Sequence, residues 1–143
     1  MMRRGHSLLE LLVVLALLGL AVTLATPVVG DFLDWVAADG AAHDVAVALS
    51  VTRQTALNRG TLARLRISSD SLVVDLRDTG AWVPWRRFTG PASRGVSLTA
   101  SNPEVVFSPL GMGWGASNTT ITLLRGARSE RITTSRVGRV KRW

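Results

Sequence analysis

Few side chains of this 143-residue sequence could carry out a chemical reaction. The chain has no cysteine, which excludes disulfides, thiolate metal sites and cysteine nucleophiles. Its two histidines are His6 and His43, and His43 is next to Asp44 on an expected helix, where adjacent side chains do not face each other. Serine therefore lacks a base for a catalytic triad, and neither a cluster of metal ligands nor a phosphate-binding glycine loop is present. The sequence predicts a protein that is not an enzyme and that needs no metal or cofactor.

The charged side chains are spread unevenly along the chain, whose formal net charge is +7. Arg3 and Arg4 begin the sequence, and residues 125–143 carry seven basic side chains against the single acid Glu130. The remainder of the chain is close to neutral. A basic beginning of this kind favours a fixed orientation in a membrane, and a basic end favours an anionic partner.

A long apolar segment covers residues 8–29, where Glu10, Thr23 and Thr26 are the only polar side chains. As a helix it is long enough to cross a hydrocarbon core of about 30 Å at about 1.5 Å per residue. Basic residues precede this segment and aspartates follow it. The positive-inside rule therefore predicts a cytoplasmic N-terminus, with the rest of the chain across the membrane.

A cleaved secretory signal is the alternative reading of the same segment, and residues 21–26 offer a loose match to its cleavage site. Three features weigh against it. Glu10 lies inside the apolar segment, where a carboxylate is costly and usually functional. Gly5 lies just before the segment, separated from it by His6 and Ser7, and the amphipathic helix continues beyond the segment.

The twelve residues that begin at Gly5 (GHSLLELLVVLA) resemble the class III signal of type IV pilins and type II secretion pseudopilins. The resemblance implies that a prepilin peptidase cleaves between Gly5 and His6 and that His6, the new N-terminal residue, is methylated. Glu10 is then the fifth residue of the mature chain, as in that family. Pro27 matches a proline common late in the family's membrane helix, whereas His6 stands where the family strongly prefers phenylalanine.

Glu10 carries a carboxylate that is expensive in lipid unless it is neutralised or paired. In a filament, the α-amino group freed by cleavage supplies the opposite charge from a neighbouring subunit, so the resemblance assigns Glu10 to subunit assembly. The alternative is that Glu10 reaches the cytoplasmic interface, because it lies only two residues into the apolar segment.

The rest of the chain changes its period near residue 60. Residues 31–59 are expected to continue the helix, with an apolar face at helical spacing and a stop signal at Asn58-Arg59-Gly60. Short alternating segments then predict antiparallel sheet, and the glycine-rich residues 111–115 are expected to form a flexible loop. Strands are expected at residues 61–68, 71–77, 82–88, 95–100, 104–108, 119–125, 130–135 and 137–141.

These patterns together predict an α+β fold, in which a long N-terminal helix packs on antiparallel sheet and its first half crosses the membrane. Three further segments resemble the GspH/FimT group: residues 53–60 (RQTALNRG), 106–111 (VFSPLG) and 137–141 (VGRVK). The resemblance implies a pilin-like fold. It also implies a division into a cytoplasmic leader (1–5), a transmembrane helix (6–30) in the inner membrane and a periplasmic domain (31–143).

Two functions are compatible with that resemblance. The first is a minor pseudopilin of the type II secretion system, which assembles with other pseudopilins at or near the tip of a periplasmic pseudopilus. The second is a FimT-like minor pilin of a type IV pilus, in pilus assembly or in DNA binding for uptake. A plain membrane-anchored protein outside any fibre is a third possibility, against which Glu10 after Gly5 counts.

The C-terminal tail bears on the choice, because some FimT proteins bind DNA through a glycine-arginine-x-arginine motif. The matching positions here read Gly138-Arg139-Val140-Lys141. Lysine keeps the charge but contacts phosphate as a point charge rather than in bidentate fashion. The candidate DNA-binding residues are Arg136, Arg139, Lys141 and Arg142. The alternative is that these charges only protect an exposed strand edge from pairing with other chains.

The first prediction concerns processing of the N-terminus. We expect mass spectrometry of the mature protein to find His6 as its first residue, because the basic leader and the Gly5 to Glu10 spacing direct cleavage there. A mature chain that begins near Thr26 would instead reveal an ordinary secretory signal and would contradict the pilin-like reading.

Overall fold

The computed structural model describes residues 7–115 and 117–143. The predicted leader (1–5) and cleavage site, Gly5 and His6, lie outside the described residues. The chain divides into two compact units between Leu33 and Asp34. Each unit is described by itself.

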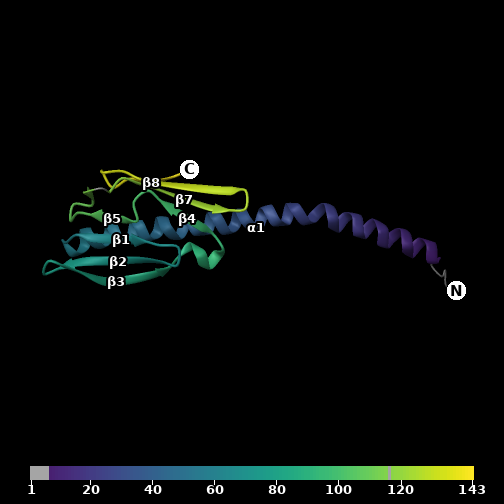
Figure 1. Cartoon of the computed structure of the whole chain (residues 1–143), viewed down its shortest axis with the longest axis horizontal. Coiled ribbons are helices and arrows are strands. Elements are labelled where there is room, and N and C mark those ends of the chain that lie inside the picture. The colour runs from purple at the N-terminus through teal and green to yellow at the C-terminus, as the bar shows by residue number, and fades with distance from the viewer. Residues whose placement is uncertain (1–6, 116) are drawn as a thin grey trace. The chain divides into compact units, whose positions relative to one another are not determined.

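One helix, α1 (Leu8–Arg59), runs through both units over 52 residues (Figure 1). In the first unit the Oγ of Ser7 accepts a hydrogen bond from the backbone N–H of Glu10 at 3.2 Å, as an N-cap does. The hydroxyls of Thr23 and Thr26 donate to backbone carbonyls one turn earlier, each at 2.8 Å. Both polar side chains are thus satisfied within the helix, which suits an apolar surrounding.

The apolar part of α1 is long enough to cross a membrane. Its most apolar 18-residue window has a mean hydropathy of 2.6, and none of that window is buried within the protein. A helix that exposes leucine and valine on every side is typical of a membrane span, where lipid rather than water surrounds the helix.

From Asp34 onward α1 buries one face. Its buried residues recur at helical spacing and most of them are alanines: Ala38, Ala41, Ala42, Val45, Ala48, Leu49, Thr52, Thr55 and Ala56. Because alanine side chains are short, strands can approach the helix backbone closely. The helix ends at Arg59, and Gly60 adopts a left-handed φ of +62°, as the predicted stop signal requires.

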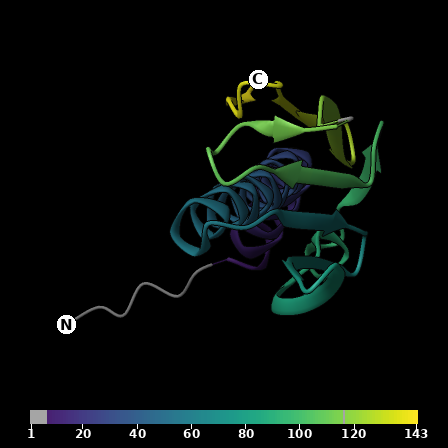
Figure 2. The ribbon, with the colours of Figure 1, turned by 90° about the vertical axis from the view of Figure 1, so that its left-hand side faces the viewer.

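Two antiparallel sheets pack on this part of α1. The first has the strand order β3 (Ala81–Thr89), β2 (Ser71–Asp78), β1 (Ala63–Ile67), β5 (Glu104–Phe107) and β6 (Gly113–Trp114). The second has the order β4 (Ser97–Ala100), β7 (Thr119–Arg125), β8 (Arg128–Thr134) and β9 (Val140–Arg142). Viewed along the helix, the strands curve around one side of α1 and leave the other side open (Figure 2). The 3-10 helix η1 (Pro91–Arg94) lies between β3 and β4 along the chain.

The core lies where the helix face meets alternate residues of both sheets. Its fully buried members come from α1, from the first sheet and from the second sheet: Val45, Leu49, Leu65, Leu72, Val74, Val105, Phe107, Ile121, Leu123 and Ile132. One cluster therefore joins all three layers, and the hydrophobic effect holds both sheets to the same helix.

Two sequence expectations are corrected by the strand boundaries. Residues 111–115 are not simply a flexible loop, because Gly113–Trp114 forms β6 and pairs with Val106 and Phe107. The last strand begins at Val140 rather than at residue 137. Gly138 has a φ of +74°, so the chain turns at the place where the alternating pattern suggested a strand.

A buried carboxylate ties together three strands of the first sheet. The Oδ2 of Asp75 on β2 accepts hydrogen bonds from Arg64 Nη2 at 2.8 Å and from Arg66 Nε at 2.7 Å, both on β1. Arg64 also contacts Glu104 on β5 at 3.2 Å. Burial by itself would raise the pKa of Asp75, but the hydrogen bonds from Arg66 and Arg64 outweigh it and hold that pKa below its ordinary value.

This network predicts a loss of stability in acid. Since the pKa of Asp75 is lower in the folded chain, its contribution is fully present above about pH 4 and is lost as the pH falls through the folded value. We expect Asp75→Asn to lower the free energy of unfolding at pH 7 and to flatten its decline below pH 4. Urea unfolding of the full chain in detergent, followed by tryptophan fluorescence, measures both effects.

Glu104→Gln is the matched control for Asp75→Asn. Its carboxylate also contacts Arg64, but the Glu104 side chain is 46% exposed. Water already screens such a contact, so this change should cost little at any pH. Equal losses from the two variants would contradict the role given to the buried carboxylate.

Candidate functional site

Glu10 lies in the first turn of α1, where the partial positive charge of the helix N-terminus favours a carboxylate. Its backbone N–H hydrogen-bonds to the Oγ and the carbonyl oxygen of Ser7, at 3.2 Å and 3.0 Å. Exposed leucines surround Glu10 on the helix. The acid thus stands on a rigid element close to the predicted cleavage site, whose own residues lie outside the described part of the chain.

The C-terminal tail makes a tight turn before β9. The backbone N–H of Gly138 donates to the carbonyl of Ser135 at 2.9 Å, and the N–H of Ser135 donates to the carbonyl of Arg139 at 3.0 Å. The carbonyl of Arg136 accepts the N–H of Gly113 at 2.7 Å. The first two bonds close the turn, and the third holds the turn against β6, which belongs to the other sheet.

Gly138 lies in the most crowded part of this turn. A Cβ added to it would lie 2.3 Å from the carbonyl oxygen of Gly111, which itself accepts a hydrogen bond from Arg53 Nε at 2.8 Å. The glycine of the Gly138-Arg139 pair therefore has a packing role. It lets the tail approach the Gly111 loop and the exposed side of α1.

The four candidate DNA-binding residues do not form one free basic surface. Arg142 ion-pairs with Asp39 on α1 and lies 3.6 Å from Glu130. Lys141 points to the opposite face of β9, with its Nζ 3.3 Å from the centre of the Trp143 ring. Arg136 and Arg139 are exposed on the turn. All four side chains are exposed, but Arg142 is paired with acids of the same chain.

Three ion pairs between α1 and the strand-bearing region were not foreseen from the sequence. Asp34 pairs with Arg125 at 2.8 Å, Asp39 pairs with Arg142, and Asp44 pairs with Arg94 at 2.9 Å. We call them the helix ion pairs. The signal in the sequence was the spacing of the aspartates, five residues apart, but nothing local identifies their distant partners. Each is partly exposed and is worth at most about 1 kcal/mol.

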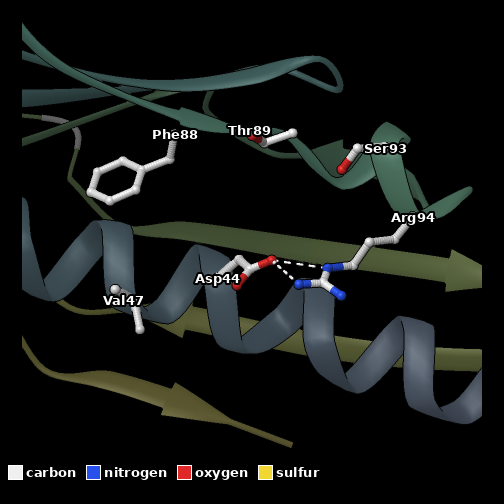
Figure 3. A pocket seen from close by; sticks show the side chains of 6 residues that line it. All are labelled: Asp44, Val47, Phe88, Thr89, Ser93 and Arg94. Atoms are coloured by element: carbon white, nitrogen blue, oxygen red, sulfur yellow. Dashed lines mark hydrogen bonds and ion pairs between the residues drawn. The ribbon is translucent and has the colours of Figure 1, made fainter.

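The Asp44–Arg94 pair closes one side of a surface hollow (Figure 3). Val47 on α1 and Phe88, Thr89 and Ser93 line the rest of it. Of the described residues that line it, Asp44 and Arg94 are charged, and they neutralise each other. Among residues 7–115 and 117–143, no group of three or more histidine or acidic side chains is placed to hold a metal ion.

The long helix with an apolar first half and antiparallel sheets around its second half defines the pilin-like class of fold. The minor type IV pilin FimU of Pseudomonas aeruginosa superimposes with a TM-score of 0.65 at 14% identity, over 77% of this chain and 90% of that one. The minor pseudopilin EpsH of the Vibrio cholerae type 2 secretion system gives a TM-score of 0.61 at 15% identity, over 74% and 95%. The predicted α+β, pilin-like fold is confirmed.

The family is shown by sequence. Residues 41–138 match the family described as type II transport protein GspH, and residues 1–26 match the prokaryotic N-terminal methylation motif. The chain belongs to the GspH family. It is also 27% identical to the pilin-like protein PilA1 of Thermus thermophilus, over 99% of both chains.

Membership in this family makes the chain a pilin-like structural subunit anchored in a membrane by its apolar helix. Such subunits assemble with one another and are processed through the N-terminal motif. The similar proteins include both a secretion pseudopilin and pilins. The comparisons therefore define a class of subunit that is shared by secretion systems and type IV pili.

The packing of Gly138 leads to a prediction with a close internal control. We expect Gly138→Ala to lower the free energy of unfolding by about 3 kcal/mol, because the new methyl group meets the Gly111 carbonyl and the left-handed φ adds strain. Gly60→Ala carries a similar positive φ but meets nothing within 4 Å, so it should cost about 1 kcal/mol. Urea unfolding of the full chain in detergent compares them, and equal costs would contradict the packing role.

Proposed function

We propose that this chain is a minor pseudopilin of the type II secretion system, a structural subunit of the periplasmic pseudopilus near its tip. Prepilin peptidase cleaves it between Gly5 and His6, and His6 is methylated. Residues 6–30 anchor it in the inner membrane with a cytoplasmic N-terminus, and residues 31–143 form the periplasmic domain. The observation that carries the proposal is α1 itself, because one continuous helix joins an exposed apolar anchor to the core of a GspH-family domain.

Glu10 has the role of aligning subunits as they enter the fibre. Cleavage after Gly5 leaves a positively charged α-amino group on His6, four residues before Glu10. In lipid, that amino group and the carboxylate of a neighbouring subunit stabilise each other far more than they would in water. The pairing sets the axial register between neighbouring helices, and the exposed leucines and valines then pack side by side.

Two contacts of the tail support the secretion role over DNA uptake. Arg142 is held by Asp39 and Glu130, so one of the four candidate cations is occupied within the protein. Gly138 serves the packing of the tail on the Gly111 loop, which gives the glycine-arginine pair a structural reason to exist. The alternative, a FimT-like minor pilin that binds DNA, rests on Arg136, Arg139 and Lys141, which are exposed.

The assembly role predicts the effect of Glu10→Ala. Insertion into the membrane should be unchanged or improved, because a carboxylate is removed from lipid. Incorporation into the fibre and secretion should fall, because the partner for a neighbour's amino terminus is lost. Co-purification with the other pseudopilins and a secretion assay measure the two effects.

Thr23→Ala is the control, since it also removes a polar group from the apolar helix. The Thr23 hydroxyl bonds only to the Gly19 carbonyl of the same helix in the described structure, so its loss should leave assembly unaffected. Normal secretion by Glu10→Ala would refute the assigned role.

The DNA alternative is tested on the same full chain by gel shift with duplex DNA at two salt concentrations. If the alternative is correct, binding falls steeply with salt as counterions are released, and Arg139→Gln with Lys141→Gln weakens binding and flattens that dependence. No binding at low salt would remove the alternative.

A further inference from the structure

Five large apolar side chains are exposed around the end of α1. They are 41% to 74% accessible and come from the helix, the loop between β5 and β7, and the tail turn: Leu57, Leu110, Met112, Trp114 and Val137. We call them the distal patch. Exposed apolar side chains that gather in one place, rather than singly, are typical of an interaction surface.

The three segments of the distal patch are held together by specific contacts. Arg53 on α1 donates to the Gly111 carbonyl at 2.8 Å, and a Cβ on Gly111 would lie 3.2 Å from the Leu57 side chain. The Gly113 N–H donates to the Arg136 carbonyl at 2.7 Å. All three segments therefore meet where α1 ends (Figure 1). The patch is a defined surface, already arranged before any partner binds.

A hollow borders the patch between the helix and the tail. Its volume is about 520 Å³, and Leu57, Arg53, Gly138 and Arg139 are among its lining residues. A concave site beside projecting apolar side chains can receive a side chain from a partner, as the buried centres of protein interfaces do.

The charged side chains that border the distal patch are basic. Arg53, Arg136 and Arg139 border the patch and are exposed. No acidic residue occurs in residues 50–60, 108–115 or 135–143. Tryptophan, methionine and arginine are the residue types enriched in protein interfaces, and such a surface is complementary to apolar groups ringed by carboxylates.

We infer that the distal patch is the docking site for an acidic, apolar surface of a different subunit of the same fibre. The inference rests on the proposed function only in taking this partner to be a fellow subunit. A protein fits better than DNA, because Leu110, Met112 and Val137 offer nothing to a phosphate backbone.

A second copy of this chain fits poorly, because most of its own carboxylates already contact its own arginines. These acids are Asp34, Asp39, Asp44, Asp75, Glu104 and Glu130. The exposed acids outside these pairs that could serve a second copy, Asp31, Asp70 and Asp78, do not form one acidic surface, because Asp31 lies on α1 and Asp70 and Asp78 lie at opposite ends of β2. The carboxylates that complement Arg53, Arg136 and Arg139 therefore come from another sequence.

The test is site-specific photocross-linking of the full chain in the cells that produce it. Trp114 is replaced by p-benzoyl-phenylalanine, and mass spectrometry identifies the cross-linked peptide. The expected product is an adduct with a different membrane-anchored pilin-like subunit, at a peptide that combines aspartate or glutamate with apolar residues. Leu110, at 74% exposure, provides a second position if the Trp114 variant does not fold.

Two controls make the result specific. The same probe at Trp143, which is 65% exposed but lies beyond β9 on the other sheet, should not give this adduct. Arg136→Glu with Arg139→Glu should lower the adduct yield at least about tenfold, through repulsion of the partner's carboxylates. Arg128→Glu with Arg131→Glu, the same charge change on β8, should leave the yield unchanged.

An adduct with a second copy, with DNA or with neither would overturn the docking site, and so would a yield that charge reversal does not change. Failure of the proposed function looks different. In that case Glu10→Ala secretes normally, whatever the cross-link shows.

Discussion

The structure depends on one helix, α1, whose first part must be stable in lipid and whose second part must be stable against protein and water. Within a helix such as α1 the backbone N–H and carbonyl groups pair along the helix, apart from the turn that contains Pro27, and such pairing is the condition for crossing lipid. The same helix then continues, without a break at Pro27 or Gly40, into a region where its environment is protein and water. Its side chains change accordingly, from apolar on all sides to a single buried face of alanine, valine and leucine.

The second half of α1 determines how the sheets are built. Because its buried face is mostly alanine, the strands lie close to the helix, and apart from Leu49 the larger side chains of the core come from the sheets, among them Leu65, Phe107, Ile121 and Ile132. This burial holds the fold together. The helix ion pairs add little energy, but they join α1 to η1, to the β7–β8 hairpin and to β9, so they orient these elements around the helix.

The surfaces that remain have different chemistry at different places. Outward-facing Arg64 and Arg66 are neutralised by Asp75 and Glu104, which leaves the middle of the first sheet without strong net charge. Arg136 and Arg139, by contrast, are exposed and lie beside exposed apolar side chains where α1 ends. A subunit with different surfaces at different places is suited to contacts with different neighbours in an assembly.

The sequence by itself determined the features that depend on neighbouring residues. The apolar segment, the stop signal at Asn58-Arg59-Gly60 and the alternation of most strands are local patterns, and the helix end and α+β fold follow from them. Only the tertiary structure decided the contacts between distant residues. Gly113 lies in a strand because β6 pairs with β5 and the Gly113 N–H donates to the Arg136 carbonyl. The chain turns at Gly138, where the Gly111 carbonyl lies against it, and Arg142 pairs with Asp39, 103 residues away. Such partners are selected by packing in three dimensions, for which a pattern along the chain carries no signal.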